Sequence, residues 1–201
     1  MPHRAVINRT AEPASLIQDL RCSVLVGLHP VPGGSTGLVD LVNAAGKLRT
    51  HGGELFAVYN EEPFVVTAYY AATRSREISP ATGQPREAPY VPREEAGLDA
   101  ALEDDDSGAY LATEIFYTGR QALQDDPYRN VSAPYTTLGI LAAQRLGRLT
   151  VFANAENLTN VRQTRFEPLL RPSVGEGGQW KVDAWAPLDG RRFNAGVRYH
   201  F

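Results

Sequence analysis

The residues with the clearest chemical potential lie near the end of the chain, in a stretch that is rich in glycine and proline. Three arginines and two tryptophans fall within it: Arg162, Arg165, Arg171, Trp180 and Trp185. Guanidinium groups pair with anions and stack on aromatic rings. The set could therefore hold an anionic ligand such as a metal chelate. The alternative is that the arginines are solubilising charges and that the tryptophans anchor a membrane interface.

Other patterns that could do chemistry are weak. The acidic run Glu103–Asp106 lacks the spaced carboxylates and the distal glutamate of a calcium loop. The segment Gly175–Gly178 follows no strand and opens no helix, as a phosphate-binding loop would. The histidines are scattered, Cys22 is the single cysteine, and no Gly-x-Ser-x-Gly elbow occurs. We therefore expect no enzyme activity, no catalytic residues, no metal site and no cofactor.

Composition narrows the class of protein. Charged residues make up 21% of the 201-residue chain and the formal net charge is −3, so no basic surface suggests a nucleic-acid partner. No apolar run approaches the about 20 residues of a membrane-spanning helix. A membrane barrel stays compatible, because its strands alternate and keep the mean hydropathy low. The 18 glycines and 14 prolines are typical of a protein built from strands and turns.

The final segment separates its residues into two walls. Alternate positions carry Phe193, Ala195, Val197, Tyr199 and Phe201, and the positions between them carry Asn194, Gly196, Arg198 and His200. Since side chains point to opposite faces along a strand, one wall is apolar and the other polar. A closing strand of a bacterial outer-membrane barrel has this pattern, with its apolar wall facing lipid. A strand of a soluble sheet is the alternative.

Seven earlier segments alternate in a similar way, which gives eight predicted strands of roughly the length that spans a bilayer. They are Gly37–Asn43, Arg49–Tyr59, Phe64–Thr73, Ala96–Glu103, Ala109–Thr118, Thr136–Arg145, Arg148–Asn157 and Arg192–Phe201. Short turns are expected at Ala45–Gly46, Asn60–Pro63, Asp104–Gly108 and Leu146–Gly147. Longer connections are expected at Arg74–Glu94, Gly119–Ala133 and Leu158–Gly190. Thr136–Gly147 is also compatible with a helix, but we interpret it as a strand because it lies between strands.

These features predict an all-β protein, an antiparallel up-and-down meander of about eight strands that forms part of a transmembrane β-barrel. The wall that faces lipid can be predicted from the free-energy cost of placing a charge in the bilayer. A charged side chain on the lipid-facing wall destabilises a barrel by about 2–4 kcal/mol near the midplane. The outward wall is expected to include Leu138, Ile140, Leu149, Val151, Phe193, Val197 and Tyr199. The inward wall is expected to include Asn154, Glu156, Asn194 and Arg198.

Two motifs near the end carry a family resemblance. The segment VFANAENLTN, Val151–Asn160, is followed by a loop with Arg162 and Arg165 and by GRRFNAGVRYHF, Gly190–Phe201. This order resembles the end of a TonB-dependent outer-membrane receptor. Upstream, Leu41–Tyr59 is similar to an earlier strand pair of these receptors. The resemblance covers residues 37–201, and residues 1–36 form an unassigned N-terminal segment.

The resemblance implies a barrel of about 22 strands with a plug inside it, of which this chain would supply the last eight strands. It implies a place in the outer membrane, with the lipid bilayer as a partner, and uptake of a scarce ligand such as a ferric siderophore. The plug and the region that contacts TonB would not be present in this chain, which is therefore not expected to transport alone. The N-terminus also shows no signal peptide, so a leader is expected upstream or the chain is not exported.

Two other functions remain open from the sequence. One is a complete small barrel of eight strands with a structural or binding role, in which Gly37–Asn43 would pair with Arg192–Phe201. The other is a soluble β-sheet binding module, in which a second sheet would cover the apolar wall.

Overall fold

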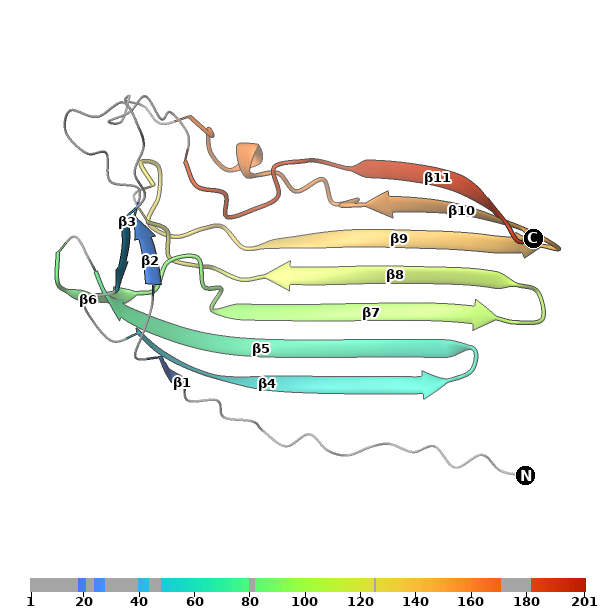
Figure 1. Cartoon of the computed structure of the whole chain (residues 1–201), viewed down its shortest axis with the longest axis horizontal. Helices are drawn as coiled ribbons and strands as arrows, with labels where there is room; N and C mark the ends of the chain where they lie inside the picture. The colour runs from blue at the N-terminus through green and yellow to red at the C-terminus, as the bar shows by residue number, and fades with distance from the viewer. Residues whose placement is uncertain are drawn as a thin grey trace.

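The computed structural model describes residues 18–20, 24–27, 40–43, 48–79, 82–124, 126–170 and 182–201. The chain forms one large antiparallel meander (Figure 1). Its long strands are β4 (Leu48–Glu61), β5 (Phe64–Ile78), β7 (Glu94–Asp104), β8 (Ala109–Thr118), β9 (Tyr135–Leu146), β10 (Leu149–Glu156) and β11 (Arg192–Tyr199). The short strand β1 (Gln18–Leu20) pairs with β4, and β6 (Pro85–Glu87) pairs with β5. The predicted all-β meander is therefore confirmed.

Helical structure is nearly absent from the described ranges. One short 3-10 turn, η1, spans Gln163–Arg165. The segment that was also compatible with a helix is the twelve-residue strand β9. None of the helical structure in the described ranges is long and apolar enough to cross a membrane.

The first predicted strand pair differs from the structure. The part of Gly37–Asn43 that is described forms β3 (Asp40–Asn43), but it pairs with β2 (Val24–Gly27) in a separate sheet of two strands. The edge of β4 that was assigned to it is occupied by β1 instead. Alternation shows that a segment is a strand, but it does not identify the strand with which the segment pairs. The predicted turn at Ala45–Gly46 lies outside the described residues.

The strands pair in constant register, so each wall of the sheet runs unbroken from β4 to β11. Val151 lies opposite Val197, and Asn154 lies opposite Asn194. By this register the predicted outward residues share one wall and the predicted inward residues share the other. Apolar side chains on the first wall are strongly exposed: Phe193 is 69% exposed and Val197 64%. We call the two sides the apolar wall and the polar wall.

The polar wall is not uniform. It carries Asp99, Glu114 and Glu156 over its middle, whereas the exposed residues Phe56 and Val58 lie on it near the β4–β5 turn. Aromatic rings on this wall lie across glycines of the next strand. A Cβ atom at Gly97 would come within 2.1 Å of Tyr69 Cε1, so the ring needs this position to be glycine.

The tight turns are built from local contacts. Asp104 accepts hydrogen bonds from the Asp106 backbone at 3.1 Å and from the Ser107 hydroxyl at 2.7 Å. Gly108 and Gly147 have φ values of 67° and 62°, which favour glycine. Aspartate, serine and glycine thus supply the hydrogen bonds and the backbone freedom that these turns require.

Among the described strands, β11 pairs only with β10, and the order of the sheet ends there. The sheet is therefore open. The pairing of Gly37–Asn43 with Arg192–Phe201 that would close a complete small barrel is not found in the described part of either segment.

Candidate functional site

The longer connections all lie at one end of the sheet, opposite the tight turns (Figure 1). They follow β5, β8 and β10, and they carry the predicted ligand candidates. We call this region the loop end. Its described residues pack on one another through a buried polar network.

The loop after β10 begins with a turn that accounts for the NLTN motif. Asn157 and Asn160 have φ values of 50° and 57°, a conformation that asparagine tolerates well. The Asn157 amide donates to the carbonyl of Val161 at 2.8 Å and to that of Asp189 at 3.0 Å. Its Oδ1 accepts a hydrogen bond from the Val161 backbone at 2.9 Å. One side chain therefore ties the start of the loop to its end, just before β11.

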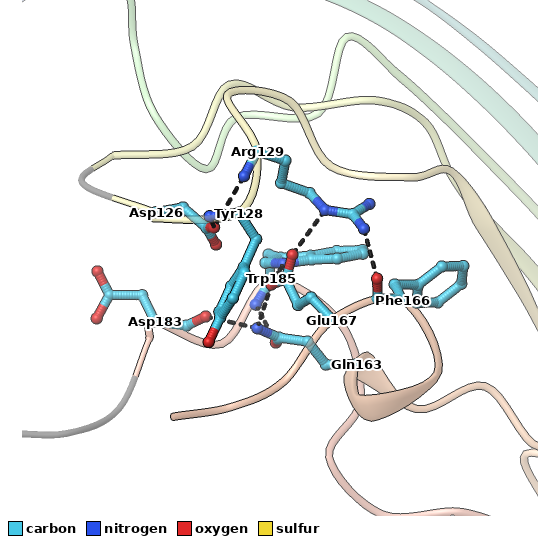
Figure 2. A network of polar contacts seen from close by, with 8 residues as sticks. All are labelled: Asp126, Tyr128, Arg129, Gln163, Phe166, Glu167, Asp183 and Trp185. Carbon is cyan, nitrogen blue, oxygen red and sulfur yellow. Dashed lines mark hydrogen bonds and ion pairs between the residues drawn. The ribbon is translucent and has the colours of Figure 1, made fainter. Parts of the chain in front are cut away.

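Trp185 is the centre of the buried network (Figure 2). Its ring is only 5% exposed, and its Nε1 donates to Glu167 Oε1 at 2.5 Å. The fully buried Gln163 accepts from the Trp185 backbone at 2.9 Å and donates to Glu167 at 3.0 Å and to the Asp183 carbonyl at 2.9 Å. Phe166 packs against the indole with ring centroids 5.3 Å apart.

An arginine from the neighbouring loop completes this network. Arg129 lies over the Trp185 ring, 5.5 Å from its centroid, and its Nε forms an ion pair with Glu167 Oε2 at 2.6 Å. Its Nη2 also donates to the Phe166 carbonyl at 2.6 Å (Figure 2). The Glu167 carboxylate is almost completely buried, so Arg129 supplies the charge that balances it.

Two further contacts join the three loops. Gln121 donates from its side chain to the Trp185 carbonyl at 2.9 Å, and its backbone pairs with Ser132. The Tyr90 hydroxyl donates to Asp183 at 2.9 Å. Burial and then the hydrogen bond to Asp183 raise the pKa of Tyr90 above its usual range, so the phenol stays protonated at neutral pH. The loops after β5, β8 and β10 therefore form one packed unit.

The predicted ligand candidates fall in different environments. Arg165 is exposed in η1, and Arg162 is half-buried beside Gly190. Trp185 is buried, so it holds the loops together rather than presenting its ring to solvent. Arg171 and Trp180 lie outside the described residues, as do Cys22 and Gly175–Gly178.

Sequence reasoning missed the partners of Trp185. Gln163, Glu167 and Arg129 belong to no motif, and the last lies in another loop. The one local signal is that Gln163 and Glu167 are four residues apart, a spacing that lets side chains meet across one helical turn.

A hollow of about 440 Å³ lies on the middle of the polar wall. Its polar lining residues include Thr67, Asp99, Glu114, Asn154 and Glu156. Asp99 and Glu114 are direct cross-strand neighbours, so two like charges face one another there. Within the part of the chain that the structure describes, no cluster of three or more His, Cys, Asp or Glu side chains could hold a metal ion. The hollow is therefore an acidic surface without a built site.

No protein-family model and no curated protein matches the sequence. Three chains of solved structures do match the fold, and two of them are described here. The ferric-catecholate import receptor Fiu from E. coli K12, in its closed form, matches with a TM-score of 0.56 and 16% identity over 84% of this chain. A mutant of the ferric enterobactin receptor PfeA from Pseudomonas aeruginosa matches with a TM-score of 0.56 and 16% identity over 90% of this chain.

The matches cover only 23% of the Fiu chain and 27% of the PfeA chain. This chain therefore spans about a quarter of the length of the receptors that it matches. Both are named as receptors rather than enzymes, in agreement with the expectation that this chain is not an enzyme. The resemblance seen in the sequence is confirmed at the level of the fold, which this chain shares with part of two ferric receptors.

Proposed function

We propose that this chain is part of the barrel wall of a TonB-dependent outer-membrane receptor for a scarce ligand such as a ferric siderophore. The observation that supports it best is the open antiparallel meander with one exposed apolar wall and one polar wall. The fold shared with two ferric receptors supports the same conclusion. On this proposal residues 37–201 belong to the barrel, and residues 1–36 have no assigned role.

The distribution of charge on the two walls fits a bilayer. Asp99, Glu114, Glu156 and Arg198 all lie on the polar wall, which would face a wet lumen. Between Phe64 and Tyr70, every residue of β5 on the apolar wall is uncharged. A sheet with this arrangement buries apolar surface in lipid without desolvating a charge.

The loop end would lie outside the cell and contribute to ligand binding. Arg162, Arg165, Arg171 and Trp180 remain the proposed contacts. The network around Trp185 would hold the part of the loop that carries Arg162 and Arg165. The plug and the segment that contacts TonB would come from other parts of the receptor. Because the chain matches only a quarter of such receptors, we propose that it does not transport alone.

The placement of the apolar wall can be tested by cysteine labelling. In a Cys22→Ser background, Val197→Cys and Asn194→Cys variants of the whole chain would be refolded into lipid vesicles and treated with a water-soluble maleimide. We expect protection at Val197 and labelling at Asn194, because the register puts the two residues on opposite walls. Equal labelling at both positions would contradict a lipid-facing apolar wall and would favour a soluble sheet.

A charge substitution tests the same assignment by its cost. Val197→Arg places a charge on the apolar wall and should impair insertion by about 2–4 kcal/mol, whereas Asn194→Arg should cost little. Flotation of the vesicles with bound protein measures the difference.

The receptor assignment has an independent test in the DNA upstream of Met1. We expect a reading frame for a plug and about fourteen more strands, and a clean intergenic region would favour a complete small barrel.

A further inference from the structure

A second hollow, of about 500 Å³, lies where β5 reaches the loop end. It is lined by Arg74, Ser75, Arg76, Pro85, Arg86, Glu87 and Arg93. Nothing in the proposed uptake function uses it. We call it the arginine pocket.

The pocket carries an excess of positive charge. Arg93 donates two hydrogen bonds to Glu87, at 2.7 and 2.6 Å. The Nη1 of Arg74 donates to the Thr73 carbonyl at 3.0 Å and to the Arg93 carbonyl at 3.2 Å. The hydrogen bonds from Arg93 lower the pKa of Glu87, and the nearby Arg74 and Arg76 lower it further, so the carboxylate is charged at neutral pH. Three guanidinium groups therefore surround one carboxylate.

The exposed cations of this pocket belong to the apolar wall. Arg74 and Arg76 follow Phe64 and Tyr70 on the same parity of β5, and both arginines are exposed. In the adjacent strand Arg49 lies directly opposite Arg76, which places like charges side by side. Arg86 and Glu77, whose ion pair measures 2.6 Å, are instead residues of the polar wall. The exposed guanidinium groups of Arg74 and Arg76 thus belong to the wall that would face away from the lumen.

The position of Arg74 and Arg76 along the membrane normal can be compared with the thickness of the bilayer. A strand rises about 3.3 Å per residue, and barrel strands tilt by about 40°. Arg74 and Arg76 are ten and twelve residues beyond Phe64 in β5, so they lie about 25–30 Å further along the membrane normal. The apolar band of such barrels is about 25 Å tall. The arginines therefore lie at the level where lipid phosphates begin.

We propose that the arginine pocket binds the phosphate group of a membrane lipid in the leaflet next to the loop end. Guanidinium groups form strong paired hydrogen bonds with phosphate oxygens, and basic pockets at this depth bind lipid headgroups. A phosphate between Arg74 and Arg76 would also relieve the repulsion among the cations. This inference rests on the proposed function, because it requires the apolar wall to face lipid.

The test measures binding of a fluorescent phosphatidic acid to the whole chain in non-ionic detergent micelles, by fluorescence anisotropy. We expect the double variant Arg74→Gln/Arg76→Gln to weaken binding at least tenfold. The matched control, Arg145→Gln/Arg148→Gln, removes two exposed charges at the β9–β10 turn, at the other end of the sheet, and should leave binding within twofold. Glu87→Gln raises the net charge of the pocket and should tighten binding. The circular dichroism of each variant shows whether its sheet has formed.

The outcomes separate this inference from the proposed function. Equal losses in the double variant and in its control, or no tightening in Glu87→Gln, would overturn the lipid site. Displacement of the lipid by inorganic phosphate at similar concentration would show that the pocket binds the free anion instead, and it would overturn the lipid assignment. If Val197 is protected in vesicles but phosphatidic acid binds no better than phosphatidylcholine, only the lipid site fails. If Val197 is labelled like Asn194, the proposed function fails first.

Discussion

The two ends of the sheet are stabilised in different ways. At the turn end, the side chain of Asp104 accepts hydrogen bonds only from groups two and three residues further along the chain. At the loop end, the Arg129 side chain meets a carbonyl 37 residues away, and Tyr90 meets a carboxylate 93 residues away. Each tight turn is therefore shaped mainly by contacts within it, and the neighbouring strand adds a hydrogen bond from Gln144 Nε2 to the Ser107 carbonyl at 2.7 Å. The loop end depends chiefly on side-chain partners that come from different loops.

The largest effect should come from removing the buried carboxylate of the loop end. Glu167→Ala leaves the Arg129 charge and the Trp185 Nε1 without their partner. Loss of one member of a buried pair costs about 3–5 kcal/mol, so all three loops should open while the strands persist. Hydrogen exchange of the backbone at Gln121 and Ser132 measures this opening. Unchanged exchange there would show that the loops are held independently of one another.

A smaller and strictly local effect is expected at the turn end. Gly147 has a φ of 62°, so Gly147→Ala should destabilise the β9–β10 hairpin by about 1–2 kcal/mol. Gly147→Asn should cost less, because asparagine tolerates this conformation. Thermal unfolding in detergent gives both values. If Gly147→Ala also opened the loop end, this would contradict the conclusion that the two ends of the sheet are stabilised in different ways.

The smallest effect is a dependence of the loop end on alkaline pH. Burial and the hydrogen bond to Asp183 raise the pKa of Tyr90 above 10.0, its ordinary value. The folded loops therefore hold the phenol proton more tightly than the unfolded chain does. This contribution is complete below pH 10 and is lost as the pH rises above it. Tryptophan fluorescence should report the loosening, and Tyr90→Phe should remove this part of the pH dependence.

The strands were predictable because their signal is local. The prediction for Ala109–Thr118 coincides with β8, and that for Arg192–Phe201 exceeds β11 by two residues. Alternation fixes which residues share a wall, and a tight turn fixes the partner. For the segment before β4 the predicted partner was wrong, because β3 pairs with β2 and β1 occupies the edge of β4.

The loop end was predictable only in part. Trp185 could be singled out as an aromatic residue in a long loop, but its burial depends on Glu167, Gln163 and Arg129. No sequence pattern at these residues predicts their contacts with Trp185, because the network forms between loops rather than within one. The arginine pocket was missed for a related reason. Its charges come from β5, from β6 and from the residue just before β7, and no single segment is strongly basic.

The constant register of the meander has a consequence for how such a sheet can be altered. Each long strand from β5 to β10 pairs chiefly with its sequence neighbours, so the sheet behaves as a linear array of hairpins. Removal of the hairpin at one edge would leave the pairing of every remaining hairpin as it was. Strand number is therefore a quantity that gene duplication or deletion can change in steps of two, without disturbing which residues of the remaining strands share the apolar wall.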